Sequence, residues 1–79
     1  MNEMVTYKTE VLEFNDERYT VQFRVRMDGE FYDLLATNEL TKKEVSGTYS
    51  REVAEDFKHT TGKSLENIVF QILKDEIAK

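Results

Sequence analysis

The clearest pattern in the sequence is a strict alternation of apolar and polar residues from Tyr19 to Met27. Apolar residues, most of them aromatic or β-branched, occupy every second position, and threonine, glutamine and two arginines lie between them. A period of two with this composition predicts a β-strand with one buried face. The following Asp28-Gly29 favours a tight turn, so the pattern predicts a β-hairpin.

The predicted turn also fixes how the two strands of this hairpin pair. A two-residue loop places Met27 opposite Glu30, and it therefore places Phe23 opposite Leu34. The strand over 30–37 then continues the apolar face of the first, because paired residues lie on the same side of a sheet. Turn chemistry and hydrophobic pattern thus agree on one register.

A further strand is predicted upstream, over 5–14, with residues 15–18 as the connection. If Phe14 lies opposite Tyr19, the apolar residues near the end of this strand face the core and the earlier ones face away from it. The face that the apolar residues occupy changes near Val11-Leu12, and such a change is typical of a β-bulge. We therefore predict an irregularity within the first strand.

Beyond residue 37 the alternation ends and helix signals begin. Thr41-Lys-Lys-Glu44 matches a capping box, which predicts a short helical turn that ends at Gly47. Ser50 is a suitable N-cap for a helix over 50–61, and Ser64 for a helix over 65–78. The last helix has an apolar stripe with spacings of three and four residues, formed by Leu65, Ile68, Val69, Ile72, Leu73 and Ile77.

These elements together predict an α+β fold. We expect a three-stranded antiparallel β-meander in the order 1-2-3, followed by two C-terminal α-helices packed on one face of the sheet. A chain of 79 residues has room for one core, so residues 1–79 are expected to form a single domain, with the β-meander over 1–37 and the helical half over 38–79. The residues expected to be buried together are Val21, Phe23, Val25, Leu34, Phe57, Ile68, Val69, Ile72 and Leu73.

The composition and the net charge of the chain limit the cellular location and the classes of partner that we expect. The chain has no cysteine, no run of about 20 apolar residues and no basic, apolar leader, so we expect a cytoplasmic protein without a membrane-spanning segment. Its net charge is −5, with nine acidic and four basic residues in positions 1–40. Such a field repels nucleic acid and anionic membranes, so we expect neither as a partner.

No combination of residues predicts catalysis, a metal site or a cofactor. His59 is the only histidine, and a nucleophilic triad or a histidine–cysteine metal site needs further partners. Gly62-Lys63-Ser64 resembles the end of a phosphate-binding loop, but Phe57 stands where that loop needs a glycine. Glu10 is either a buried carboxylate on the apolar side or turned outward by the strand irregularity. We therefore expect no enzymatic activity.

The sheet face turned away from the predicted helices carries the most informative set of residues. Two aromatic, two aliphatic and two arginine side chains share it, and this composition is enriched at protein interfaces. The predicted protein-interaction patch consists of Tyr7, Val11, Arg24, Arg26, Phe31 and Leu35. We therefore hypothesise a small non-enzymatic module that docks through this face on a partner protein, or on a second copy as a homodimer.

Two other interpretations of this face remain open. Arg24 and Asp33 can form an ordinary cross-strand ion pair, with Arg26 lying over Tyr7 and Phe31, and the face is then ordinary surface. Alternatively, the domain binds nucleic acid, either through its helical half or by stacking bases on an arginine and aromatic platform of the sheet.

Overall fold

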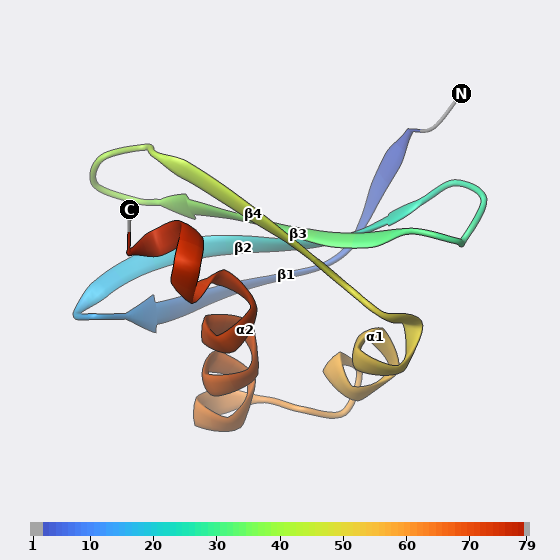
Figure 1. The fold of residues 1–79 in the computed structure, drawn as a ribbon. Helices are drawn as coiled ribbons and strands as arrows, with labels where there is room; N and C mark the ends of the chain where they lie inside the picture. The colour runs from blue at the N-terminus through green and yellow to red at the C-terminus, as the bar shows by residue number, and fades with distance from the viewer. Residues whose placement is uncertain (1–2, 79) are drawn as a thin grey trace.

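The chain folds into an antiparallel sheet with two helices on one of its faces (Figure 1). The structure is a computed structural model, and it describes residues 3–78. The strands are β1 (Met4–Phe14), β2 (Glu17–Arg26), β3 (Tyr32–Asn38) and β4 (Glu44–Tyr49), in the order β1-β2-β3-β4. The helices are α1 (Arg51–Phe57) and α2 (Gly62–Ile77). The α+β class and the two C-terminal helices are confirmed, but the sheet within residues 3–78 has four strands, not the predicted three.

The pairing of β2 with β3 is the predicted one, with Phe23 opposite Leu34. The turn between the strands is wider than a two-residue loop. Its ends are joined by a 2.8 Å hydrogen bond from the Arg26 N–H to the Phe31 carbonyl. Gly29 has a φ of 74°, a left-handed conformation that glycine adopts without steric cost. The wider loop keeps the predicted register and therefore the predicted buried face.

The connection between β1 and β2 is tighter than predicted. Asn15 and Asp16 have φ values of 52° and 64° and form a two-residue hairpin turn, since both residue types tolerate the left-handed conformation. Phe14 therefore pairs with Glu17, and the predicted pairing with Tyr19 is wrong by two residues. A shift of two leaves each side chain on its own face, so Phe14 still lies in the core.

The irregularity of the first strand lies close to its beginning. Between Thr6 and Lys8 the register with β2 shifts by one residue, so Tyr7 is an extra residue, as in a β-bulge. From Lys8 to Phe14 the pairing is then regular. The predicted irregularity within the first strand is therefore confirmed, but it does not lie near Val11-Leu12.

The segment predicted as a helical turn contains the edge strand β4. Asn38 explains the difference, because its Oδ1 accepts the N–H groups of Leu40 at 2.9 Å and Thr41 at 3.0 Å. These bonds reverse the chain directly after β3, and Lys42, with a φ of 65°, completes the turn. β4 then pairs with β3 along its whole length. The predicted helical half, 38–79, therefore begins with a strand.

Both helices are present, with limits that differ from the predicted ones. α1 begins as predicted, with the Ser50 Oγ accepting the Val53 N–H at 3.2 Å. It ends earlier than predicted, at Phe57, whose carbonyl accepts a hydrogen bond from the Lys8 Nζ. α2 begins earlier than predicted, because its N-cap residue is Thr61 and not Ser64.

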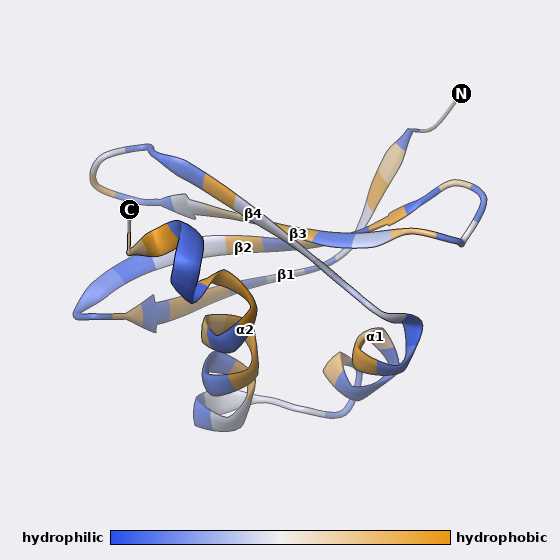
Figure 2. Cartoon of the chain, viewed as in Figure 1, coloured by the Kyte–Doolittle hydropathy of each residue, from blue (hydrophilic) through white to orange (hydrophobic). Residues whose placement is uncertain are grey.

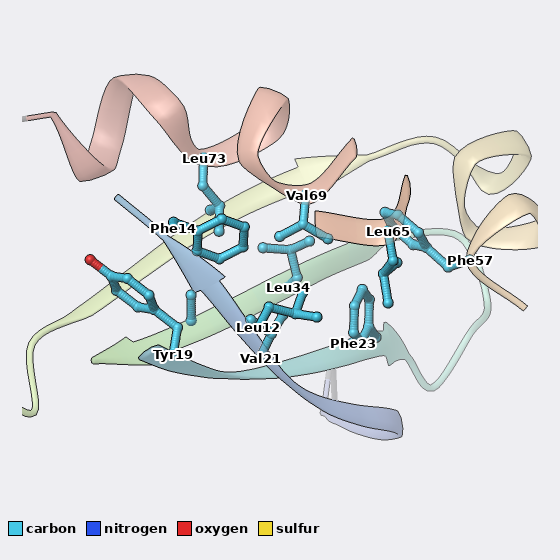
Figure 3. Close-up of a cluster of buried hydrophobic side chains, with 11 residues drawn as sticks. Leu12, Phe14, Tyr19, Val21, Phe23, Leu34, Phe57, Leu65, Val69 and Leu73 are labelled. Atoms are coloured by element: carbon cyan, nitrogen blue, oxygen red, sulfur yellow. The ribbon is translucent and has the colours of Figure 1, made fainter. Parts of the chain in front are cut away.

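The core lies between the sheet and the helices (Figure 3). Figure 2 shows hydrophobic and hydrophilic residues alternating along β2, and both kinds within the turns of α2. Phe23 is fully buried and meets Phe57 edge-on with the ring centroids 5.0 Å apart, a favoured aromatic arrangement. The buried core residues are Leu12, Phe14, Tyr19, Val21, Phe23, Leu34, Ala36, Phe57, Leu65, Val69 and Leu73.

Three residues of the predicted core are only partly buried: Val25, Ile68 and Ile72. The two isoleucines lie on the flank of α2 and not beneath it, since the fully buried positions of this helix are Leu65, Val69 and Leu73. The remaining predicted core residues are buried, which confirms the apolar faces assigned to β2, β3 and α2.

Candidate interaction surface

The sheet face opposite the helices, which we call the outer face, is covered by neither helix (Figure 1). Three cross-strand rows run over it from β1 to β4, and none of their side chains is buried. The rows are Thr6–Arg24–Asp33–Thr48, Thr9–Gln22–Leu35–Ser46 and Val11–Thr20–Thr37–Glu44. The fourth strand thus adds a polar column to the face, which is richer in threonine and serine than predicted.

The centre of the first row is a two-pronged ion pair. The Arg24 Nε and Nη2 each donate a 2.8 Å hydrogen bond to one oxygen of Asp33. This bonding raises the pKa of the Arg24 guanidinium. Paired charges of this geometry are the strong class of ionic hydrogen bond, so Arg24 is held in one orientation. The cross-strand ion pair expected between Arg24 and Asp33 is therefore present.

A second cluster lies at the β2–β3 turn. The Arg26 Nε donates to both oxygens of Asp28, at 3.0 and 2.9 Å, and the guanidinium carbon lies 5.6 Å from the centroid of the Phe31 ring. The bonds from Arg26, and one from the Glu30 N–H, hold the pKa of Asp28 below its usual value. Phe31 itself is 38% exposed. The predicted stacking of Arg26 on Phe31 is therefore present.

Two aliphatic residues of the predicted patch lie on the outer face but not together. Val11 is 55% exposed on β1, where its neighbour in the row is Thr20. Leu35 is partly exposed on β3, opposite Gln22. Because β2 separates them, the face carries single apolar side chains and not one continuous apolar patch.

Tyr7 is the patch residue that the structure places elsewhere. The bulge turns it to the helix side, where its hydroxyl lies 3.0 Å from that of Tyr49 and its ring centroid 6.4 Å from that of Phe23. Burial raises the pKa of the Tyr7 phenol. The prediction that Tyr7 lies on the outer face beneath Arg26 is therefore wrong, because the sequence pattern did not locate the bulge.

Two small cavities on the helix side were missed by the sequence analysis. The first, of about 210 Å³, is lined by Tyr7, Val25, Tyr32, Ala54, Glu55 and Lys58. The second, of about 170 Å³, is lined by Glu17, Tyr19, Asn38, Thr41, Lys43, Val45 and Ile77. Ligand pockets usually span roughly 300–1,000 Å³, so each of these has room for about one side chain. Predicting these cavities would have required the positions of the bulge at Tyr7 and of the turn at Asn38, and neither was predicted from the sequence.

The other residues singled out by the sequence lie apart from the outer face. Gly62-Lys63-Ser64 forms the first turn of α2, and His59 is exposed in the turn before it. Glu10 lies opposite Val21 on the helix side, partly exposed, 4.0 Å from the Lys8 Nζ. Across residues 3–78, no group of His, Cys, Asp and Glu is arranged to hold a metal ion. Nor does that part of the chain contain a helix with the length and apolarity to cross a membrane.

Comparison of the chain with protein-family models, with curated proteins and with solved structures finds no match. The chemistry of the molecular surface is therefore the basis for assigning a function.

Proposed function

We propose that this domain is a small non-enzymatic protein-interaction module, which docks through its outer face on a partner protein or on a second copy. The asymmetry of the sheet is the observation that supports this most, because both helices cover one face and neither covers the other (Figure 1). This uncovered face carries arginine, the exposed Phe31 and single aliphatic side chains, and arginine and aromatic residues are enriched at protein interfaces.

Phe31 is the central contact in this proposal. It is the exposed aromatic residue of the outer face, and Arg26 lies over its ring. A partner that covers Phe31 would bury apolar area and strengthen the cation–π contact by removing water from it. Binding free energy at interfaces is concentrated in such aromatic and arginine residues.

The charges of the outer face favour a protein partner over nucleic acid. Nucleic-acid affinity comes mainly from unpaired cations that replace the counterions of phosphates. The two arginines of the proposed patch are both bound to aspartates, Arg24 to Asp33 and Arg26 to Asp28. A phosphate would therefore have to displace an aspartate at each position, in a chain of net charge −5.

The sizes of the cavities favour a binding role over catalysis. The two cavities, of about 210 and 170 Å³, accept a side chain more readily than a substrate molecule.

We extend the proposal to a cytoplasmic location, in keeping with a sequence without cysteine. Fractionation of cells that produce the protein tests this location.

The test of the outer face compares two variants with the same change of charge. Phe31→Glu alters the proposed contact, and Leu40→Glu alters the β3–β4 loop, where Leu40 is 89% exposed. Both should unfold at nearly the native temperature, because neither side chain belongs to the core. A partner retained by the native chain and by Leu40→Glu, but lost with Phe31→Glu, would support the proposal. Equal retention by all three chains would contradict it.

A separate measurement addresses the nucleic-acid alternative. We expect no mobility shift of duplex DNA or single-stranded RNA at micromolar protein and physiological salt. A shift that weakens with added salt and disappears in Arg24→Ala/Arg26→Ala would reverse the preference for a protein partner.

A further inference from the structure

The two edges of the sheet differ in how they are protected against pairing with another strand. β1 has a bulge at Tyr7 and an inward-facing charge at Lys8, both of which discourage an additional strand. β4 pairs with β3 without a register shift, and its sequence contains no proline or lysine. Its single charged residue is Glu44, at its first position. β4 is therefore the edge that is open to strand addition.

The backbone groups of β4 that point away from the sheet can be identified from the turn before it. The Asn38 N–H donates to the Lys43 carbonyl at 2.9 Å, which marks this pair as hydrogen-bonded. Because such pairs alternate along an antiparallel ladder, every second residue of β4 from Val45 onward bonds to β3. The N–H and C=O groups of the other three residues then point outward, and these residues are Glu44, Ser46 and Thr48.

We propose that two copies of this chain associate by pairing β4 with β4, antiparallel, around a two-fold axis through Ser46. In this register Ser46 lies opposite Ser46 of the second copy, and Glu44 lies opposite Thr48 of the second copy. Every outward-pointing backbone group of these residues then meets a complementary group. The product is a continuous sheet of eight strands, four from each copy.

The side chains of β4 suit this register on both faces. Residues that lie opposite each other in a sheet point to the same side of it. The outer faces of both copies therefore become one surface, and the helices of both copies lie on the other side. On the helix side, Val45 lies opposite Gly47 of the second copy, beside the Ile72 side chain that covers that glycine. On the outer face Glu44 meets a threonine, so no like charges are directly opposed.

The flank of α2 supplies apolar area beside this edge. Ile72 lies over Gly47 of β4, with its Cγ2 2.7 Å from where a Cβ of that glycine would be. Ile68 is one helical turn away on the same flank, and both isoleucines are only partly buried in a single copy. The two-fold axis brings this flank of α2 toward the same flank of the second copy. Their burial is the apolar contribution that a lone β4 strand pair would lack.

This self-association goes beyond the proposed function and uses a different surface, so both can operate at once. Joining two outer faces in one sheet would make the module bivalent, which strengthens binding to any partner that carries two sites. The net charge of −5 on each copy opposes the pairing. Association should therefore strengthen as salt is added, because salt screens the repulsion between the copies.

The experiment measures molecular mass against concentration for the full chain and two matched variants. Ser46→Lys places two ammonium groups against each other at the axis. Thr9→Lys adds the same charge to the same outer-face row at the opposite edge. The native chain and Thr9→Lys should change from one chain to two as concentration rises. Ser46→Lys should require at least a roughly tenfold higher concentration, because like charges directly opposed destabilise a strand pair.

Three outcomes would overturn the inference. The native chain could keep the mass of one chain up to about 1 mM, or Ser46→Lys could associate as strongly as the native chain. Thr9→Lys could also lose association to the same extent as Ser46→Lys. If Ser46→Lys fails to fold, Ser46→Pro serves instead, since an edge strand accepts proline where its N–H points outward. Slowed amide exchange of Ser46 and Thr48 at high concentration is expected with the native chain. Loss of the dimer in Phe31→Glu would overturn the β4 assignment while supporting the outer face as the docking surface.

Discussion

Gly47 and Ile72 approach each other so closely that no side chain fits between them, since a Cβ on Gly47 would lie 2.7 Å from the Ile72 Cγ2. The same Cβ would lie 3.2 Å from the Leu73 Cδ2. Glycine in a strand interior normally weakens the strand, because it has no side chain to pack. Here its small size allows α2 to lie directly on β4.

Gly47→Ala should lower the free energy of unfolding by about 1–3 kcal/mol, because an added methyl group in a packed contact forces its neighbours to move. Ile72→Ala in the same background should restore part of this loss, since it removes the group that the methyl meets. Ser46→Ala, at the adjacent exposed position, is the control and should change stability by less than about 0.5 kcal/mol. Denaturant titrations measure all three, and an unchanged midpoint for Gly47→Ala would contradict the close contact.

The parts of the fold that the sequence predicts are those where two local signals agree. The β2–β3 register followed from an alternating pattern and a glycine turn, and both point to Phe23 opposite Leu34. The β1–β2 turn carries Asn15-Asp16, a weaker signal than a glycine turn, and its register was predicted two residues out. β4 was missed because the capping-box pattern at Thr41 is equally compatible with the turn that the Asn38 side chain stabilises.

The positions of the patch residues were likewise predicted correctly only where the register of their strands was predicted correctly. Arg24, Arg26 and Leu35 lie on the outer face because they belong to the hairpin whose register was predicted correctly. Tyr7 lies on the helix side because one extra residue in β1 reverses which face it occupies. The hydrophobic pattern predicted an irregularity in this strand but did not show which residue is the extra one. The open edge of β4 depends on the strand that was missed, so it had no precursor in the sequence analysis.

The core substitutions with the largest expected effect are Phe23→Ala and Leu73→Ala, since both side chains are fully buried. Phe23→Ala should cost about 3–5 kcal/mol and Leu73→Ala about 2–5 kcal/mol, from lost burial and the cavity left behind. Either is a large part of the stability of a small domain. Val11→Ala, at a position 55% exposed, should change stability only slightly. Similar unfolding midpoints for the core and surface variants would show that the core is misassigned.

Asp28 should contribute to the acid dependence of stability. Its pKa is lowered in the folded chain, chiefly by the hydrogen bonds from Arg26, so its ionised form is favoured there. The contribution is present above the ordinary aspartate pKa of about 3.9 and is lost as pH falls through the folded value. A carboxyl titration by NMR should place Asp28 below the ordinary value, and Arg26→Gln should return it upward. A pKa of Asp28 that does not respond to Arg26→Gln would refute the pairing.

The phenols of Tyr7 and Tyr49 should make the fold sensitive to alkali. Burial and the hydrogen bond to Tyr7 raise the pKa of Tyr49, and burial raises that of Tyr7. The neutral phenols are therefore favoured in the folded chain, and the unfolded chain ionises first. Their contribution to stability is complete below the ordinary tyrosine pKa of about 10 and is lost as pH rises above it.

Replacing both phenols separates this effect from the ionisation of lysines. Tyr7→Phe/Tyr49→Phe removes the shared hydrogen bond, which should cost about 0.5–1.5 kcal/mol at neutral pH. Above about pH 10 the difference from the native chain should shrink, because the variant has no buried phenol to keep neutral. Absorbance titration of the native chain should show tyrosines that ionise later than free phenol, and the double variant should lack that component. A native chain whose tyrosines all ionise near pH 10 would show that the pair is exposed to water.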